Sequence, residues 1–337
     1  MTVYYYRPFV QTGPRRPSEA LTLAGGWCWF THVEVIQRGA PSSYVPAGRL
    51  PPDALRKLTA SRAPLGELTF DEPRLMGILN VTPDSFSDGG RFNGAAMALK
   101  HAKSMAERGA DIIDVGGEST RPGALEVPHE AEIARTAPVI TALRSAVQIP
   151  ISIDTRKAVV AAAALDAGAD FINDVSGLTF DAALTPLCAE REAPVFVMHA
   201  QGTPQKMQLD PQYEDVVLDV YDYLAERIDK LKSAGIPSER IVVDPGIGFG
   251  KTIEHNLKLL SSLSLFHSLG CAILLGVSRK GFIRKIGLVD SAQESAHGSV
   301  ATGLVGIAQG VQLLRVHDVG ETKQALRLWL SATRGEY

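Results

Sequence analysis

The sequence has few cysteines and no long apolar run, and each shortage argues against a class of protein. Its three cysteines, Cys28, Cys188 and Cys271, are far apart and lack metal-ligand spacing, which is typical of reduced thiols in a cytosol. We expect the last two to be buried. No apolar stretch approaches the ~20 residues of a membrane span, and the first residues do not resemble a secretion signal. The expected protein is cytoplasmic and does not bind a membrane.

The sequence also has little net charge. A formal net charge of −3 and a pI of about 6.3 give no reason to expect nucleic acid as a partner. Any anion that the protein binds must therefore be held by a local group of cations. With 337 residues, 45% of them hydrophobic, the chain can bury a sizeable core.

The chain divides near residue 70. Residues 1–70 contain Pro-rich and Gly-rich stretches around a short aromatic block at 27–30. We expect a small β-rich extension that packs on the main domain, because surface aromatics usually need cover. A regulatory or partner-binding element is the alternative. Residues 71–337 are close in number to the ~250 of a (β/α)8 barrel, and we expect them to form the catalytic domain.

The main domain contains eight short, mostly apolar runs that alternate with helix-like segments. Each run stops at a polar residue, in order Asn80, Asp114, Asp154, Asn173, His199, Asp244, Ser278 and Arg315. Apolar strands that alternate with helices are typical of a buried parallel sheet. In a (β/α)8 barrel the carboxyl ends of all strands lie on one face. We therefore predict an α/β fold of this kind, with the eight polar residues at a single mouth.

Glycines separate the expected helices from the next runs. Gly109 follows good helix formers at 94–108, and its missing side chain suits a left-handed helix end. The same feature is expected at Gly168, Gly235, Gly270 and Gly310. Further helices are expected at 128–146, which proline opens, and at 158–167, which is rich in alanine.

Four of the residues at the predicted mouth need hydrogen-bond donors. They are Asp114, Asp154, Asp244 and Asn173. Unpaired carboxylates are costly among apolar walls, and a heteroaromatic ring with several N–H groups would supply the donors. The structural alternative is ion pairing with Lys280, Arg315 or Arg121, and both can hold at once. His199 is better explained as a satisfied core residue than as a base.

Cations follow the last two runs. The seventh run leads into Ser278-Arg279-Lys280-Gly281 and the eighth into Arg315-Val316-His317-Asp318. These are the two loops where barrels often bind phosphate, and a helix beginning near either would add its N–H groups. Solvated surface charge is the alternative.

Two earlier loops also carry polar groups. The loop after Asn80 is rich in hydroxyls and carboxylates and suits a magnesium or phosphate neighbourhood. The loop after Asp114 runs through Ala124, and its glycines and proline suit a lid that delivers Thr120 and Arg121. A merely flexible surface loop is the alternative for the second.

Together these segments resemble one family. The matching segments are 80–90, 114–124, 152–155, 173–177, 198–199 with 201–204, 244–251, 278–280 and 315–319. In order, and over about residues 72–330, they closely resemble dihydropteroate synthases. The first two loops together are highly specific, whereas Ala200 and Gly281 depart from the family pattern at positions without an assigned role. Residues 1–70 lie outside the resemblance.

The resemblance implies a pterin-binding transferase of folate biosynthesis. It would condense 6-hydroxymethyl-7,8-dihydropterin diphosphate with p-aminobenzoate, giving 7,8-dihydropteroate and pyrophosphate. The implied pterin-binding residues are Asp114, Asp154, Asn173, Met198, Asp244, Phe249 and Lys280. Diphosphate would be held by Asn80, Arg121, Arg315 and His317, with Mg²⁺ at Asn80. The p-aminobenzoate contacts would be Phe86, Thr120, Pro122, Ser278 and Lys280. The family likeness further implies a homodimer and a sulfonamide target.

The expected mechanism is dissociative C–O cleavage. Pyrophosphate is a stable leaving group and the pterin ring can delocalise positive charge at its methylene carbon. Asp154 would stabilise that cation, and Lys280 and Asn80 would complete the catalytic set. Two other functions stay open: a pterin barrel that transfers methyl from methyltetrahydrofolate to a corrinoid protein, and a pterin-binding protein without turnover.

Overall fold

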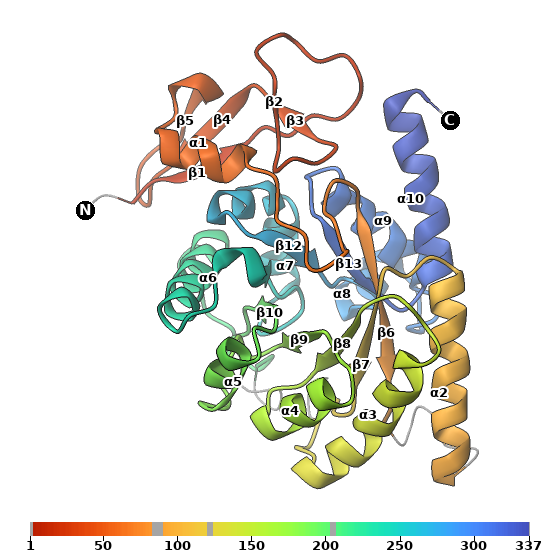
Figure 1. Ribbon diagram of the computed structural model, residues 1–337. Coiled ribbons are helices and arrows are strands. Elements are labelled where there is room, and N and C mark those ends of the chain that lie inside the picture. Colours follow the sequence, from red (N-terminus) through yellow and green to blue (C-terminus); the bar gives the residue numbers. More distant parts are fainter. Residues whose placement is uncertain (1–2, 83–89, 120–123, 203–206, 337) are drawn as a thin grey trace.

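The computed structural model describes residues 3–82, 90–119, 124–202 and 207–336, without the side chains of 90–94. Within this part of the chain eight parallel strands close into a barrel, in the order β10-β11-β12-β13-β6-β7-β8-β9 (Figure 1). The strands are β6 (Arg74–Asn80), β7 (Ile112–Gly116), β8 (Ile151–Asp154), β9 (Phe171–Asp174), β10 (Val195–Met198), β11 (Ile241–Asp244), β12 (Ala272–Leu275) and β13 (Leu313–Val316). The predicted barrel is confirmed.

Helices surround the barrel (Figure 1). In the described residues they are α2 (Gly90–Glu107), α3 (His129–Arg144), α4 (Ala158–Asp166), α5 (Leu184–Glu190), α6 (Val216–Ser233), α7 (Ile253–Leu260), α8 (Gly281–Gly287), α9 (Ala296–Ile307) and α10 (Val319–Arg334), with 3-10 turns η3 (Ser238–Arg240) and η4 (Leu263–Leu269). The five glycines expected at helix ends all have positive φ, between 84° and 107°. No helix of the described residues is long and apolar enough to cross a membrane.

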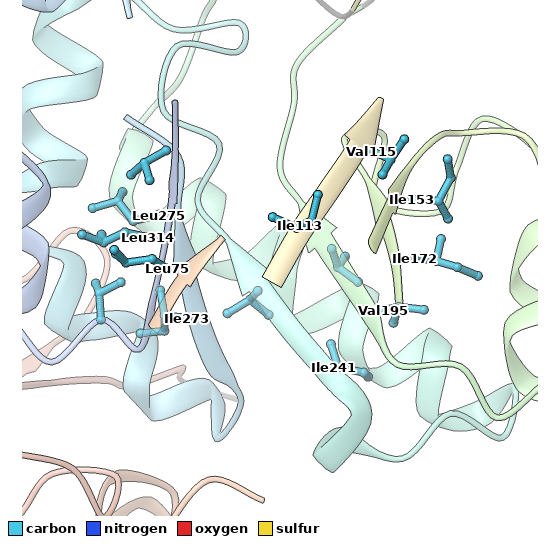
Figure 2. Packing of buried hydrophobic residues seen from close by; sticks show 14 of the residues in the cluster. Leu75, Ile113, Val115, Ile153, Ile172, Val195, Ile241, Ile273, Leu275 and Leu314 are labelled. Atoms are coloured by element: carbon cyan, nitrogen blue, oxygen red, sulfur yellow. The ribbon is translucent and has the colours of Figure 1, made fainter. Parts of the chain in front are cut away.

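The barrel strands are buried on both faces, as a parallel sheet covered by helices requires. Outward-facing side chains such as Leu75, Ile113 and Leu314 pack in the layer between the strands and the helices (Figure 2). Inward-facing side chains near the starts of the strands form a second cluster, with Met76, Ile112, Phe171, Phe196, Val242, Ala272, Leu274 and Leu313. The three cysteines are free and buried, which confirms the burial expected for Cys188 and Cys271.

The first 60 residues form small sheets, as expected of a β-rich extension. Strands β1 (Tyr5–Pro8), β4 (His32–Ile36) and β5 (Ser43–Pro46) make one antiparallel sheet, and β2 (Leu21–Thr22) pairs with β3 (Trp29–Phe30). A short turn η1 (Ala47–Arg49) and helix α1 (Pro52–Thr59) follow. The aromatic block is covered, since Phe30 is fully buried and Trp27 Nε1 donates to the Ile307 carbonyl at 2.9 Å.

The segment that joins this extension to β6 closes one end of the barrel. Leu65, Leu68 and Phe70 are buried and belong to the same cluster as the inward-facing residues at the strand starts. We call this cluster the barrel floor. It lies at the amino ends of the strands, so the opposite end is the mouth where polar residues are expected.

Some strand ends differ from the sequence-based expectation. The apolar run was expected to stop at Asp114, but β7 continues through it to Gly116. A carboxylate can stay within this buried strand because its side chain points inward to a cation and an amide. Strand β13 likewise begins at Leu313 rather than at Val311 and includes Arg315.

Candidate active site

One cation ties two strand carboxylates together at the barrel mouth. Arg315 on β13 donates from Nε to Asp114 Oδ2 at 2.6 Å and from Nη2 to Asp154 Oδ2 at 2.7 Å. Asn173 on β9 donates from Nδ2 to the same oxygen of Asp114 at 3.0 Å. The structure therefore brings together four of the predicted mouth residues, from β7, β8, β9 and β13. The ion-pairing alternative is realised for both carboxylates.

One oxygen of this group is left over. Asp114 is fully buried, and its Oδ1 has no hydrogen-bond partner among the described residues; nor has Ser152 Oγ, on the neighbouring strand. A buried acceptor without a donor is unfavourable. The arrangement favours a ligand that brings N–H or O–H groups to this wall of the barrel.

Burial also changes the ionisation of the site. Desolvation raises the pKa of Asp154 well above the ordinary aspartate value, although Arg315 opposes the shift. Burial alone would lower the pKa of Arg315, but the charges of Asp114 and Asp154 outweigh it and raise that pKa, so the guanidinium stays charged. The permanently charged Arg315 thus lies between Asp114, which has a free acceptor oxygen among the described residues, and Asp154, whose charge depends on pH.

A second group lies on β11 and the loops after β11 and β12. The Lys280 ammonium lies 3.9 Å from the centroid of the Phe249 ring, a cation–π contact. Asp244 Oδ1 accepts a hydrogen bond from the Gly246 amide at 2.7 Å. Desolvation raises the pKa of Asp244 and lowers that of Lys280. Gly248 has φ +83°, and a Cβ there would be 3.1 Å from Lys280 Cδ, so glycine lets the lysine pass.

Ser278 and His317 meet in the third group. The Ser278 hydroxyl lies 3.0 Å from His317 Nδ1 and accepts from the His317 amide at 3.1 Å. Burial lowers the pKa of His317 to about 3, so the imidazole is neutral at pH 7. Arg279 is turned into a bidentate pair with Asp318. Among the described cations of these two loops, Lys280 and Arg315 are the ones that interact with the mouth carboxylates Asp154 and Asp244. Helices α8 and α10 begin directly after these two loops.

Asn80 lies beside the ion-paired carboxylates. A Cβ on Gly116 would be at ordinary contact distance from both side chains, 3.6 Å from Asn80 Oδ1 and 3.7 Å from Asp154 Oδ2, so the two oxygens flank this position. Both atoms are hard oxygen donors, the kind that Mg²⁺ accepts. The described residues contain no group of three or more His, Cys, Asp or Glu side chains that could hold a metal by themselves.

His199, which follows the fifth barrel strand β10, packs within the core and does not point into the mouth as a free base. His199 is buried, its Nδ1 lies 2.9 Å from the Lys251 ammonium, and its ring packs on Tyr213 and Tyr223. This confirms that it is a satisfied core residue. Met198 is buried, and a Cβ on Gly246 would be 3.1 Å from its Cγ. Phe86, Thr120, Arg121 and Pro122 lie outside the described residues.

Sequence reasoning gave no role to two buried lysines. Lys251 also donates to the carbonyls of Gly246 and Phe249, and desolvation lowers its pKa to about 7. Lys157 is buried three residues after Asp154 among glutamates. Each follows a polar strand end by a few residues, a signal visible in the sequence, but their partners are known only from the fold.

The fold and this mouth define a class: a (β/α)8-barrel protein with a buried, ionisable site at the carboxyl ends of its strands. A family model described as pterin binding enzyme matches residues 76–317. The dihydropteroate synthase of Synechocystis sp. is 45% identical over 268 residues, which cover 79% of this chain and 93% of that protein.

Solved structures agree with the family match. Dihydropteroate synthase of Xanthomonas albilineans with 4-aminobenzoic acid has a TM-score of 0.75 and 44% identity, over 79% of this chain and 94% of that one. The same enzyme in complex with 7,8-dihydropteroate has a TM-score of 0.72 and 42% identity, over 79% and 95%. The chain belongs to the dihydropteroate synthases, the pterin-binding transferases of folate synthesis.

Proposed function

We propose that the mouth condenses 6-hydroxymethyl-7,8-dihydropterin diphosphate with p-aminobenzoate by dissociative C–O cleavage. The observation that carries the proposal is the Asp114 group, where a buried carboxylate oxygen beside a fixed cation has no donor in the part of the chain that the structure describes. A pterin ring presents several N–H groups along one edge and would satisfy that oxygen. The solved relative with bound dihydropteroate supports a ligand of this kind.

The pterin would be held by residues of five strands and two loops. They are Asp114, Asp154, Asn173, Met198, Asp244, Phe249 and Lys280. The Asp and Asn groups would read the ring edge, and Met198 and Phe249 would line its slot. The Lys280 ammonium lies against the Phe249 ring, where it could donate to an acceptor of the pterin ring. Burial lowers the pKa of Lys280, which favours such a hydrogen bond from a desolvated group.

The diphosphate would lie beside the pterin, against Asn80, Arg121, Arg315 and His317. Two of the five N–H donors of Arg315 are used by carboxylates, and the remaining ones suit a phosphate oxygen. Mg²⁺ would be held by Asn80 and a neighbouring carboxylate, a donor set that fits an ion keeping several waters and substrate oxygens. When bound, the ion would supply charge stabilisation to the leaving group.

The chemical step needs no strong base, because the attacking arylamine is already neutral. As the C–O bond breaks, the pyrophosphate oxygen takes the electron pair and the methylene carbon becomes cationic. The ionised carboxylate of Asp154 would stabilise that cation, since Arg315 holds it in a fixed position. The neutral arylamine then attacks the carbon and loses a proton. Ser278, Lys280, Phe86, Thr120 and Pro122 would position p-aminobenzoate.

The function is tested by a coupled assay of pyrophosphate release from the purified protein. Dihydropterin diphosphate, Mg²⁺ and p-aminobenzoate are supplied, and 7,8-dihydropteroate is confirmed by mass. We expect stoichiometric product and pyrophosphate. Tight pterin binding without product would instead make the chain a pterin-binding protein and overturn the proposal.

The dissociative step has its own test. The protein is incubated with dihydropterin diphosphate and isotopically labelled pyrophosphate, with no p-aminobenzoate present. Dissociative cleavage predicts that label enters the dihydropterin diphosphate, because the cation is recaptured by pyrophosphate. Exchange that requires p-aminobenzoate would indicate a direct displacement.

We further propose that the chain acts as a cytoplasmic homodimer that joins through barrel helices away from the mouth. Val305 of α9 is a large apolar side chain exposed by 48%. The number of subunits is measured by sedimentation, and a monomer at micromolar concentration would contradict this part.

A further inference from the structure

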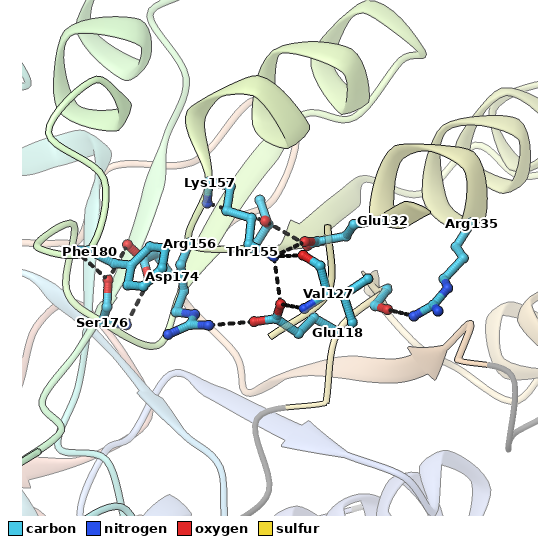
Figure 3. Close-up of polar contacts among 11 residues, drawn as sticks. Glu118, Val127, Glu132, Arg135, Thr155, Arg156, Lys157, Asp174, Ser176 and Phe180 are labelled. Carbon is cyan, nitrogen blue, oxygen red and sulfur yellow. Dashed lines mark hydrogen bonds and ion pairs between the residues drawn. The ribbon is translucent and has the colours of Figure 1, made fainter. Parts of the chain in front are cut away.

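A cluster of buried charges lies just beyond the carboxyl ends of β7 and β8 (Figure 3). It consists of Glu118, Glu132, Thr155, Arg156 and Lys157, and we call it the Lys157 cluster. Glu118 follows β7, Glu132 lies on α3, and the other three lead from β8 to α4. The chemistry proposed above uses none of them.

Lys157 is the centre of this cluster. Its side chain is 1% exposed, and its ammonium donates to Glu118 Oε2 at 2.5 Å, to the Val127 carbonyl at 2.6 Å and to Glu132 Oε2 at 2.7 Å. An ammonium has three N–H donors, so each has an acceptor. A buried cation with three short contacts fixes the relative positions of the three chain segments that supply them.

Glu118 is held as firmly. Its Oε1 accepts from Arg156 Nη2 at 2.5 Å, and its Oε2 also accepts from the Val127 amide at 2.8 Å. Burial alone would raise the pKa of Glu118, but the hydrogen bonds from Lys157, Val127 and Arg156 outweigh it and hold that pKa below its ordinary value. The carboxylate is therefore ionised, and each of its two oxygens is engaged.

The cluster is completed by contacts with α3 and with the loop that follows β9. Thr155 Oγ1 donates to Glu132 Oε1 at 2.7 Å, and the Arg156 guanidinium lies 4.1 Å from the centroid of the Phe180 ring. Two carboxylates face two cations, so the charge is balanced within the cluster. Breaking a balanced buried group by removing one member is strongly unfavourable.

These contacts hold both ends of the segment that follows β7. Glu118 and Val127 are tied to each other and to Lys157, and Arg135 of α3 donates to the Gly117 carbonyl at 2.9 Å. Gly117 itself is pressed on α3, because a Cβ there would be 2.7 Å from Thr136 Cγ2. The strands need no such support: β8 is hydrogen-bonded to β7 and to β9 along its length.

We propose that Lys157 is a positioning residue that fixes Glu118 and Val127 relative to β8, without touching either substrate. The inference rests on the proposed function, which assigns p-aminobenzoate contacts to Thr120 and Pro122, between these two residues in the sequence, and most pterin contacts to the strands. Loss of the ammonium should therefore disturb the second substrate and the chemical step, and leave pterin binding intact.

The test compares Lys157→Met with wild type in steady-state and binding experiments. We expect KM for p-aminobenzoate to rise about tenfold and kcat to fall about tenfold, the order of effect of a displaced contact. The equilibrium Kd for a pterin should stay within about twofold, since the strands carry that site. General destabilisation would not separate the two substrates in this way. Lys103→Met, at an exposed position of α2, is the matched control and should change neither constant.

A second variant decides the matter if Lys157→Met does not fold. Glu118→Gln keeps the shape of the side chain but replaces one charged oxygen with a donor that cannot accept from Arg156 or Lys157. It should show the same split with a smaller rise in KM for p-aminobenzoate, about threefold. Unchanged constants in the folded variants, or an equal loss of pterin affinity, would overturn the role of Lys157. Absence of product with the wild-type chain would instead overturn the proposed function.

Discussion

The two ends of the barrel differ in the kind of side chain that they bury. The floor is an apolar cluster in which Leu65, Leu68 and Phe70 meet the first residues of the strands. The mouth holds Asp114, Asp154 and Arg315 in direct ion pairs, and Asp114 Oδ1 has no donor among the described residues. Among the described residues, the floor is an apolar cluster that needs no polar partner, whereas the mouth contains a buried acceptor that a ligand donor would satisfy.

The difference shows where stability and function are separated in this chain. Burial of apolar side chains at the floor stabilises the fold and contributes no reactive group. Burial of charged side chains at the mouth costs free energy of folding but provides the groups that bind and react. Substitutions at the two ends should then affect different measurements. The following predictions test that separation, beginning with the largest expected effect.

At the mouth, Asp154→Asn should lower kcat by about 10³-fold, or ~4 kcal/mol in activation free energy, because it removes the charge proposed to stabilise the methylene cation. The free energy of unfolding should change far less than this. Turnover of dihydropterin diphosphate is measured beside Asp229→Asn, an exposed aspartate of α6. Wild-type turnover in Asp154→Asn would remove the residue from the mechanism.

At the floor, Phe70→Ala should lower the free energy of unfolding by about 3 kcal/mol through lost burial and a cavity. Both KM values should stay unchanged at a temperature where the variant is folded. Urea denaturation gives the stability, and Leu328→Ala, at a side chain 66% exposed, is the control with an effect under about 0.5 kcal/mol. A selective rise in a KM for Phe70→Ala would break the separation of the two ends.

The mouth should also respond to pH. Burial raises the pKa of Asp154 above the ordinary 3.8, so its ionised form is lost as pH falls through that raised value. Log kcat/KM should then fall by about one unit per pH unit on an acid limb that lies well above pH 3.8. On the basic side, the lowered pKa of Lys280 predicts a loss of its cation below the ordinary 10.5. A flat profile from pH 5 to 9 would contradict the assigned roles.

The smallest effect is expected where the extension meets α6. Arg38 pairs with Asp219 at 2.7 Å and with Asp222 at 2.8 Å, but all three side chains are partly exposed. Arg38→Ala should therefore cost about 1 kcal/mol or less, and lose even that difference in high salt. Thermal unfolding at two salt concentrations measures it. A loss of several kcal/mol would show that these surface pairs hold the extension.

The sequence predicts the barrel because its signal is repeated. Eight apolar runs with helix-forming segments between them fit one architecture, and the glycines at 109, 168, 235, 270 and 310 mark the helix ends through backbone geometry alone. A β-rich extension does not predict helix α1, because Pro51 and Pro52 belong to one of its Pro-rich stretches. Proline at the first helical turn is in fact a helix start.

The sequence predicts which residues form the site better than it predicts the contacts between them. The polar strand ends were found, but not that Arg315 pairs with Asp114 and Asp154 at once. Such a pair depends on the closure of β13 onto β6 and on inward side-chain directions. The Lys157 cluster was missed for the same reason, since residues 118, 132 and 157 come together only in the fold.

Barrel closure has a consequence for the order in which the chain can fold. Strand β6 pairs with β13, so Arg74 lies opposite Leu313, and the floor joins Leu65 to that same last strand. These contacts link segments 239 residues apart, from Arg74 to Leu313, which slows folding and keeps the apolar floor open until β13 has been synthesised. The residues that make the floor stable in the finished protein are thus the ones that need protection longest on the ribosome.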